Sequence, residues 1–197
     1  MIKKKIVCLS SNQIKFNNKQ LKIREKKTLS LIKKIIKIFK DWKIDYWFAN
    51  SSTLGIIRKD DLASFSDVDI LVKSEHIKKF YNALKLKKIK FKFNLFKKKN
   101  KIKQIILTSG KQRIKEEPAL LDIKPLLTHN NKFYQPIHDN KFLSYEKKFF
   151  KYKNITNYKD IKINIPFNEK KYLTKMYGKS WKKRAKFWFK DSYKNFS

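Results

Sequence analysis

The chain has 197 residues, enough for one domain with a hydrophobic core but too few for two large domains. Hydrophobic residues make up 41% and aromatic residues 15%, which argues against a disordered chain. The formal net charge is +35, yet only 4 of the 51 basic residues are Arg, the residue that reads phosphates and bases most closely. We therefore expect the charge to attract anionic substrates rather than to mark a nucleic-acid-binding protein.

The first half of the chain predicts a helix, a strand and a short helix. Residues 1–25 are polar and rich in Lys, and we expect an irregular lead-in. The apolar spacing from Leu29 to Trp42 then predicts a helix that begins at Thr28 as its N-cap. The short aromatic run Ile44–Ala49 predicts a buried strand. A short helix follows, which begins near Ser51 and ends at Arg58.

The second half predicts mainly strands. The expected helices begin at Ser74 and at Glu169, and Gly178 ends the second one. The expected strands are Asp67–Val72, Ile89–Phe96, Ile102–Thr108, Ala119–Ile123 before Pro125, and Ile161–Pro166. This order predicts an α+β fold, with a mixed sheet flanked by helices and a small helical segment near the C-terminus. We expect one domain over residues 26–181 and a basic, aromatic tail over residues 182–197.

Two carboxylates at the start of a strand indicate a metal site. Asp67 and Asp69 are two residues apart, so their side chains project from the same face of a sheet. Two adjacent carboxylates repel each other unless a positive charge lies between them. Mg²⁺ or a similar ion such as Mn²⁺ fits this role, because such ions take carboxylate oxygens together with substrate phosphates.

The residues before this strand indicate a phosphate-binding site. Ser51 and Ser52 stand at a predicted helix start, where backbone N–H groups and the helix dipole attract phosphate. Arg58 lies just ahead of the acidic pair, and a guanidinium group can hold a phosphate through two hydrogen bonds.

Four segments in fixed order resemble the LicD family of phosphocholine-type transferases. The first resembles the family's opening strand and Gly-Thr-Leu-Leu-Gly-x-x-Arg motif, although Ser51 stands where the family has its first glycine. The second resembles the family's Asp-x-Asp strand, although Phe65 stands where a further aspartate is frequent. The four segments are Tyr46–Arg58, Asp67–Ile70, Leu121–Leu126 and Ile165–Trp181.

The resemblance implies a nucleotidyltransferase-like fold and a Mg²⁺-dependent enzyme. Such an enzyme transfers a phospho-alcohol group, for example phosphocholine, from a CDP-activated donor to a sugar hydroxyl of a surface or lipid-linked glycan, and it releases CMP. Members of this kind modify lipopolysaccharide or cell-surface polysaccharide. The resemblance implies that Asp67 and Asp69 bind metal, and that Ser51, Ser52 and Arg58 hold the donor phosphates.

A third acid completes the implied site. Asp122 either completes the metal site or acts as the general base for the acceptor hydroxyl. Glu116 and Glu117 are the alternative third acids. We prefer Asp122 because a lone acid between Leu121 and Ile123 needs a reason to be there, whereas two glutamates beside a proline are typical of a loop.

Two other functions compete with this interpretation. The first is a nucleotidyltransferase on the same fold, which moves a nucleoside monophosphate from a triphosphate to a small molecule or RNA and releases pyrophosphate. The second is a non-catalytic, basic RNA-binding protein, whose binding is salt-sensitive and survives the loss of Asp67 and Asp69.

The location is expected to be cytoplasmic. No run of about 18 apolar residues predicts a membrane-spanning helix, and the N-terminal stretch lacks the apolar region of a signal peptide. The segment Trp181–Phe189 mixes aromatic and basic residues, a composition that suits contact with the inner face of an anionic membrane. The alternative is a terminal helix that packs its aromatic side chains on the domain, and we favour it because the segment is short.

Overall fold

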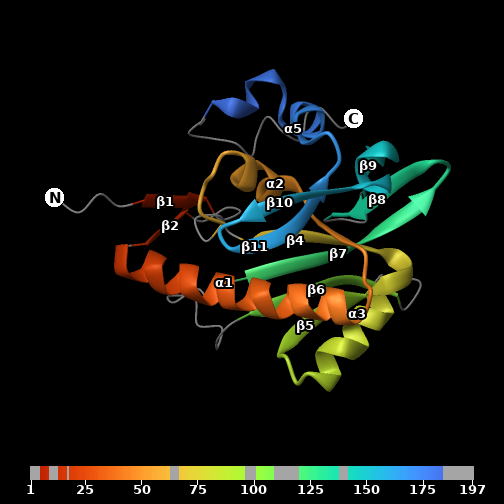
Figure 1. Cartoon of the computed structure of the whole chain (residues 1–197), viewed down its shortest axis with the longest axis horizontal. Coiled ribbons are helices and arrows are strands. Elements are labelled where there is room, and N and C mark those ends of the chain that lie inside the picture. The colour runs from red at the N-terminus through yellow and green to blue at the C-terminus, as the bar shows by residue number, and fades with distance from the viewer. Residues whose placement is uncertain are drawn as a thin grey trace.

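A mixed β-sheet lies at the centre of the computed structural model (Figure 1). The described residues are 5–8, 13–16, 18–62, 67–95, 101–108, 120–137 and 142–183. The helices are α1 (Asn18–Asp41), α2 (Asn50–Ile57), α3 (Ser74–Leu86), α4 (Lys148–Lys151), α5 (Glu169–Tyr177) and the 3₁₀ helix η3 (Lys179–Lys182). The strands are β1 (Lys5–Cys8), β2 (Gln13–Phe16), β3 (Tyr46–Phe48), β4 (Val68–Lys73), β5 (Phe91–Leu95), β6 (Ile102–Thr108), β7 (Leu120–His129), β8 (Lys132–Pro136), β9 (Phe142–Glu146), β10 (Lys153–Tyr158) and β11 (Ile161–Pro166).

The sheet combines one parallel pair with several antiparallel pairs. Its main path runs β3-β4-β7-β6-β5, and β8 and β9 continue from the far part of β7. The neighbours β4 and β7 are parallel, so both strands begin at the same edge of the sheet. Separate antiparallel hairpins are formed by β1 with β2 and by β10 with β11. The fold class is therefore α+β with a mixed sheet, as the sequence predicts.

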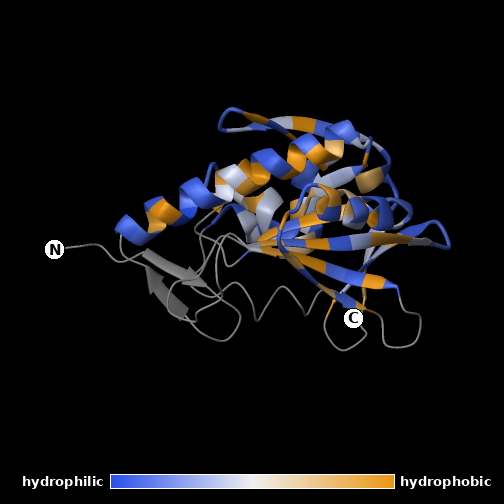
Figure 2. Ribbon diagram, turned by 90° about the horizontal axis from the view of Figure 1, so that it is seen from below, coloured by the Kyte–Doolittle hydropathy of each residue, from blue (hydrophilic) through white to orange (hydrophobic). Residues whose placement is uncertain are grey.

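One face of the sheet is covered by α1 and α3. The alternate residues Val68, Ile70 and Val72 of β4 point to this face and join a buried cluster with residues of both helices. Figure 2 shows apolar residues recurring along α1 between hydrophilic ones, as expected for a helix with one buried side. This pattern fixes the register of β4, because a slip of one residue would turn its apolar side chains away from the helices.

The opposite face of the sheet carries a second, aromatic core. There Trp47 and Leu71 join buried side chains of α2, α4, α5, β8 and β9. Tyr172 of α5 is fully buried in this cluster and packs edge-on against Phe149 and Phe150. The acidic residues of β4 and β7 belong to this second face, because Asp69 alternates with Val68 and Ile70.

Several expected element boundaries differ from the structure. Thr28 lies inside α1 rather than at its start, and its hydroxyl donates to the carbonyl of Arg24 in the preceding turn. The stretch expected to be an irregular lead-in contains β1, β2 and the first turns of α1. Strand β7 continues through Pro125, which lies beyond the last residue paired with β6, so the missing N–H interrupts no ladder on that side.

Among the described helices, none is long and apolar enough to cross a membrane.

The predicted end of α5 at Gly178 is confirmed, since Gly178 has a φ of 75° and follows the last helical residue.

Replacement of Phe39 by Ala should lower the free energy of unfolding by about 3–5 kcal/mol. Phe39 of α1 stacks on Tyr46 of β3 with ring centroids 4.3 Å apart and lies 5.0 Å from Phe80 of α3, so its loss leaves a cavity where three elements meet. Urea unfolding followed by circular dichroism measures the change. Leu86, which is 70% exposed, provides the control: Leu86→Ala should change stability by no more than about 0.5 kcal/mol. Equal losses in both variants would contradict this account of the core.

Candidate metal centre

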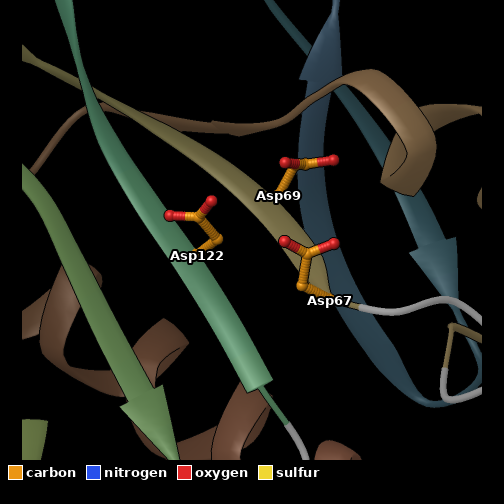
Figure 3. A group of neighbouring side chains, drawn as sticks. All are labelled: Asp67, Asp69 and Asp122. Carbon is orange, nitrogen blue, oxygen red and sulfur yellow. The ribbon is translucent and has the colours of Figure 1, made fainter. Parts of the chain in front are cut away.

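Three aspartates meet where the parallel strands β4 and β7 begin. Asp67 directly precedes β4, Asp69 is its second residue, and Asp122 lies opposite Asp69 in the register of β7. Figure 3 shows the three carboxyl groups close together, with Asp67 and Asp69 coming from one strand and Asp122 from the next. The alternation of strand side chains and the parallel pairing together produce this cluster.

The spacing of the three carboxylates fits a divalent cation. One oxygen from each residue can be chosen so that all three lie within 4.8 Å of one another. Mg²⁺ holds its oxygen ligands at about 2.0–2.1 Å, so oxygens on one ion are roughly 3–4 Å apart. Small rotations of the side chains would therefore bring all three carboxylates onto one ion.

The start of α2 is tied to Asp69 by two serine side chains. Ser51 Oγ donates a hydrogen bond of 2.6 Å to Asp69 Oδ2, and Asp69 N–H donates to Ser52 Oγ at 2.8 Å. Ser52 is buried, whereas Ser51 is partly exposed. The two serines expected to hold phosphate thus lie beside the acids, where they orient the carboxylate and the backbone of Asp69.

Backbone N–H groups at the start of α2 already donate to acceptors within the protein. Asn50 N–H donates to the Tyr172 hydroxyl at 3.0 Å, and the N–H groups of Ser52 and Thr53 both donate to the Ala49 carbonyl. The Tyr172 hydroxyl in turn donates to Asn50 Oδ1 at 3.1 Å. Asn50, with a φ of 49°, therefore links α2 to α5, a role that the sequence pattern did not reveal.

Asp122 is held by two residues that sequence reasoning missed. Gln104 of β6 donates a hydrogen bond of 2.8 Å to Asp122 Oδ1, and Lys124 forms an ion pair of 2.8 Å with Oδ2. The Asp122 side chain is only 6% exposed. Lys124 lies two residues from Asp122 on one strand, but this spacing is a weak signal in a chain so rich in lysine. Gln104 lies far from Asp122 in sequence, and only the strand pairing brings it there.

Burial and the neighbouring charges shift the pKa values of Asp69 and Lys124. Burial and then the charge of Asp67 raise the pKa of Asp69 to about 8, although Lys124 and the Ser51 hydroxyl act in the opposite direction. Burial lowers the pKa of Lys124, but the nearby carboxylates of Asp122 and Asp69 outweigh it, so the net shift is upward. Asp69 therefore holds its proton more tightly than an exposed aspartate does, as expected for a buried carboxyl group beside other acids.

The remaining predicted residues lie elsewhere or outside the described chain. Arg58 follows the last residue of α2, at the opposite end of the helix from the serines, and its guanidinium donates to the Lys183 carbonyl at 2.8 Å. Glu116 and Glu117, the alternative third acids, fall outside the described residues. The same holds for most of Trp181–Phe189, of which only the first three residues are described.

Comparison with known proteins gives a structural similarity but no sequence match. No protein-family model matches the chain, and no curated protein matches it in sequence. Among solved structures, the crystal structure of the lincosamide antibiotic adenylyltransferase LnuA with bound lincomycin is similar, with a TM-score of 0.46 and 20% identity. The match covers 70% of this chain and 79% of that one. A similarity of this degree does not establish a shared function.

Without divalent ions, the free energy of unfolding should fall as the pH rises from about 5 to about 8. Folded Asp69 keeps its proton up to a pKa of about 8, whereas the unfolded chain loses it near the ordinary value of 3.8. The folded state therefore binds more protons in this window, and each pH unit costs at most about 1.4 kcal/mol. Chemical denaturation at a series of pH values in the presence of EDTA measures this slope.

The variant Asp69→Asn should flatten that pH dependence, because its amide carries no titrating proton. Asp160→Asn serves as the control, since it removes an exposed carboxylate that pairs with Lys33 far from the cluster in sequence. If the free energy of unfolding depended on pH equally in the wild type and in Asp69→Asn, the raised pKa of Asp69 would not be its cause.

Proposed function

We propose that this protein is a divalent-metal-dependent enzyme that transfers a phosphate-containing group from a nucleotide donor to an acceptor hydroxyl. The observation that carries the proposal is the set of three aspartate oxygens within 4.8 Å of one another, on neighbouring parallel strands that begin at one sheet edge. Carboxylates arranged in this way suit Mg²⁺ or Mn²⁺, and such an ion neutralises charge on the phosphate oxygens and the leaving group.

The surrounding residues have positioning roles in this proposal. Asp67, Asp69 and Asp122 hold the ion. Ser51 orients the Asp69 carboxylate, and Gln104 fixes Asp122 from the neighbouring strand, so the ligand oxygens need little rearrangement. The acceptor hydroxyl then attacks the phosphorus atom, its proton passes to a carboxylate of the cluster, and the nucleotide's leaving group departs with the bonding electrons.

Transfer of a nucleoside monophosphate is the form that we favour. In this reaction the acceptor oxygen bonds to the α-phosphorus of a nucleoside triphosphate and pyrophosphate leaves. The net charge of +35 attracts a nucleoside triphosphate by long-range steering. It attracts CDP-choline less, because CDP-choline carries fewer negative charges and a quaternary ammonium group.

Phospho-alcohol transfer is the second candidate, with a CDP-activated donor, a sugar hydroxyl of a surface or lipid-linked glycan as acceptor, and CMP as product. The four segments that resemble the LicD family support it, because they surround the same site. Tyr172 of the last segment bonds to Asn50 of the first, and Asp122 of the third lies opposite Asp69 of the second. This form fits a chain that works in the cytoplasm at the inner face of a membrane, with the basic residues that follow Trp181 as the contact. Trp181 itself is buried and donates its indole N–H to the Thr174 hydroxyl of α5, so it does not take part in that contact.

A thermal-shift assay with and without Mg²⁺ tests both forms. We expect a Mg²⁺-dependent shift with a nucleoside triphosphate from the series ATP, CTP, GTP and UTP, and a saturating ligand at about 100 times its dissociation constant should add about 2.7 kcal/mol. The double variant Asp67→Asn/Asp69→Asn should lose the shift. Asp45→Asn should keep it, because Asp45 is a partly exposed acid that pairs with Lys73 and Lys153 away from the cluster.

The outcomes separate the candidates. A shift with CDP-choline, CDP-glycerol or CDP-ribitol alone would favour phospho-alcohol transfer, and slow turnover with water as acceptor would then release CMP rather than pyrophosphate. If no nucleotide gave a Mg²⁺-dependent shift while RNA bound tightly to the double variant, the RNA-binding alternative would replace the enzyme.

A further inference from the structure

Lys124 is a positive charge built into the carboxylate cluster. Its ammonium group lies 2.8 Å from Asp122 Oδ2, and its side chain is only 16% exposed. The same charge also acts on Asp69 and Asp67. Because Lys124 lies two residues beyond Asp122 on β7, both side chains project from the same face of the sheet.

A divalent ion bound by all three aspartates needs an oxygen of Asp122, and protein groups already contact both of its oxygens. Asp122 Oδ2 is one of the two oxygens that this residue can offer, and Gln104 already donates to the other. Two positive charges on one carboxylate oxygen repel each other strongly at this burial. An ion bound by all three aspartates and an ammonium group in its present position are therefore in competition.

The position of Lys124 on β7 allows its ammonium group to reach a second partner besides Asp122. It lies opposite Leu71, one alternation farther along the sheet than the Asp69–Asp122 pair, so its long side chain extends back over the acids. A lysine has a flexible four-carbon stem and three donors, which allows its ammonium group to move between partners by rotation alone. Phosphate oxygens of a donor bound beside the acids would lie within its reach.

We propose that the Lys124 ammonium group takes the place of the cation while the site holds no ion. When the ion and the donor bind together, the ammonium group moves from Asp122 to a phosphate oxygen of the donor. This inference rests on the proposed function and adds a regulatory consequence to it. Lys124 weakens the binding of a divalent ion alone and strengthens the binding of the ion with its nucleotide. The divalent ion and the nucleotide are therefore expected to bind cooperatively.

Removal of the lysine charge should therefore change the two affinities in opposite directions. Mn²⁺ binding to the full chain, without nucleotide, is measured by electron paramagnetic resonance, and MgATP binding is measured by isothermal titration calorimetry. Lys124→Met should bind Mn²⁺ at least about fivefold more tightly than the wild type. It should bind MgATP about tenfold more weakly, because a charge-assisted hydrogen bond to phosphate is lost.

Two further variants separate charge from packing. Lys73→Met removes an ion-paired lysine from the neighbouring strand β4, where it contacts Asp45 at 2.9 Å, and both of its affinities should stay within about twofold of the wild type. Lys124→Arg keeps the charge, so it should not tighten Mn²⁺ binding. Tightening in Lys124→Arg equal to that in Lys124→Met would overturn the inference, because size rather than charge would then be responsible.

The remaining outcomes are equally distinct. Unchanged or weaker Mn²⁺ binding in Lys124→Met, with normal binding in the wild type, overturns the inference and leaves the proposed function intact. If Lys124→Met binds Mn²⁺ more tightly but MgATP as the wild type does, the proposed contact between the Lys124 ammonium group and the donor phosphate is overturned. Absence of Mn²⁺ binding in every variant overturns the metal site itself, and the proposed function with it.

Discussion

Repulsion between three aspartates at one edge of a sheet is the constraint on which this site depends. The apolar residues Val68, Ile70 and Val72 face α1 and α3, so alternation turns Asp67 and Asp69 to the other face, and parallel pairing places Asp122 opposite Asp69. Burial then prevents water from screening the charges, which is why the pKa of Asp69 rises to about 8. Such a concentration of carboxylates is costly in a folded protein unless a cation relieves it, and this cost is the physical reason for proposing a metal-dependent enzyme.

Much of this arrangement could be predicted from the sequence, because it depends on local periodicity. The spacing of Asp67 and Asp69, followed at once by apolar residues, predicts both a strand and a common direction for the two carboxylates. The lone acid between Leu121 and Ile123 predicts a third member, and the structure places it within reach of the first two. The α+β class followed from the same periodicity, as did the end of α5 at Gly178.

The parts that could not be predicted depend on contacts between distant segments or on weak local signals. Gln104 reaches Asp122 only because β6 pairs with β7, and Asn50 meets Tyr172 only because α5 folds back onto α2. The apolar spacing predicts the start of α1 too late, because the first turns of the helix are mostly polar and carry no apolar stripe. Lys124 was overlooked for another reason: in a chain with 47 lysines, one more lysine beside an acid carries little information until its burial is known.

The most direct measurement is anomalous diffraction from crystals grown with Mn²⁺ and a non-hydrolysable nucleoside triphosphate analogue. The account predicts an anomalous peak between the carboxylates of Asp67, Asp69 and Asp122, with the Lys124 ammonium group moved from Asp122 to a phosphate oxygen. Crystals of Asp69→Asn grown in the same way should lack the peak. A Lys124–Asp122 ion pair that persists with no metal between the three aspartates would contradict the central claim that this cluster is a metal centre.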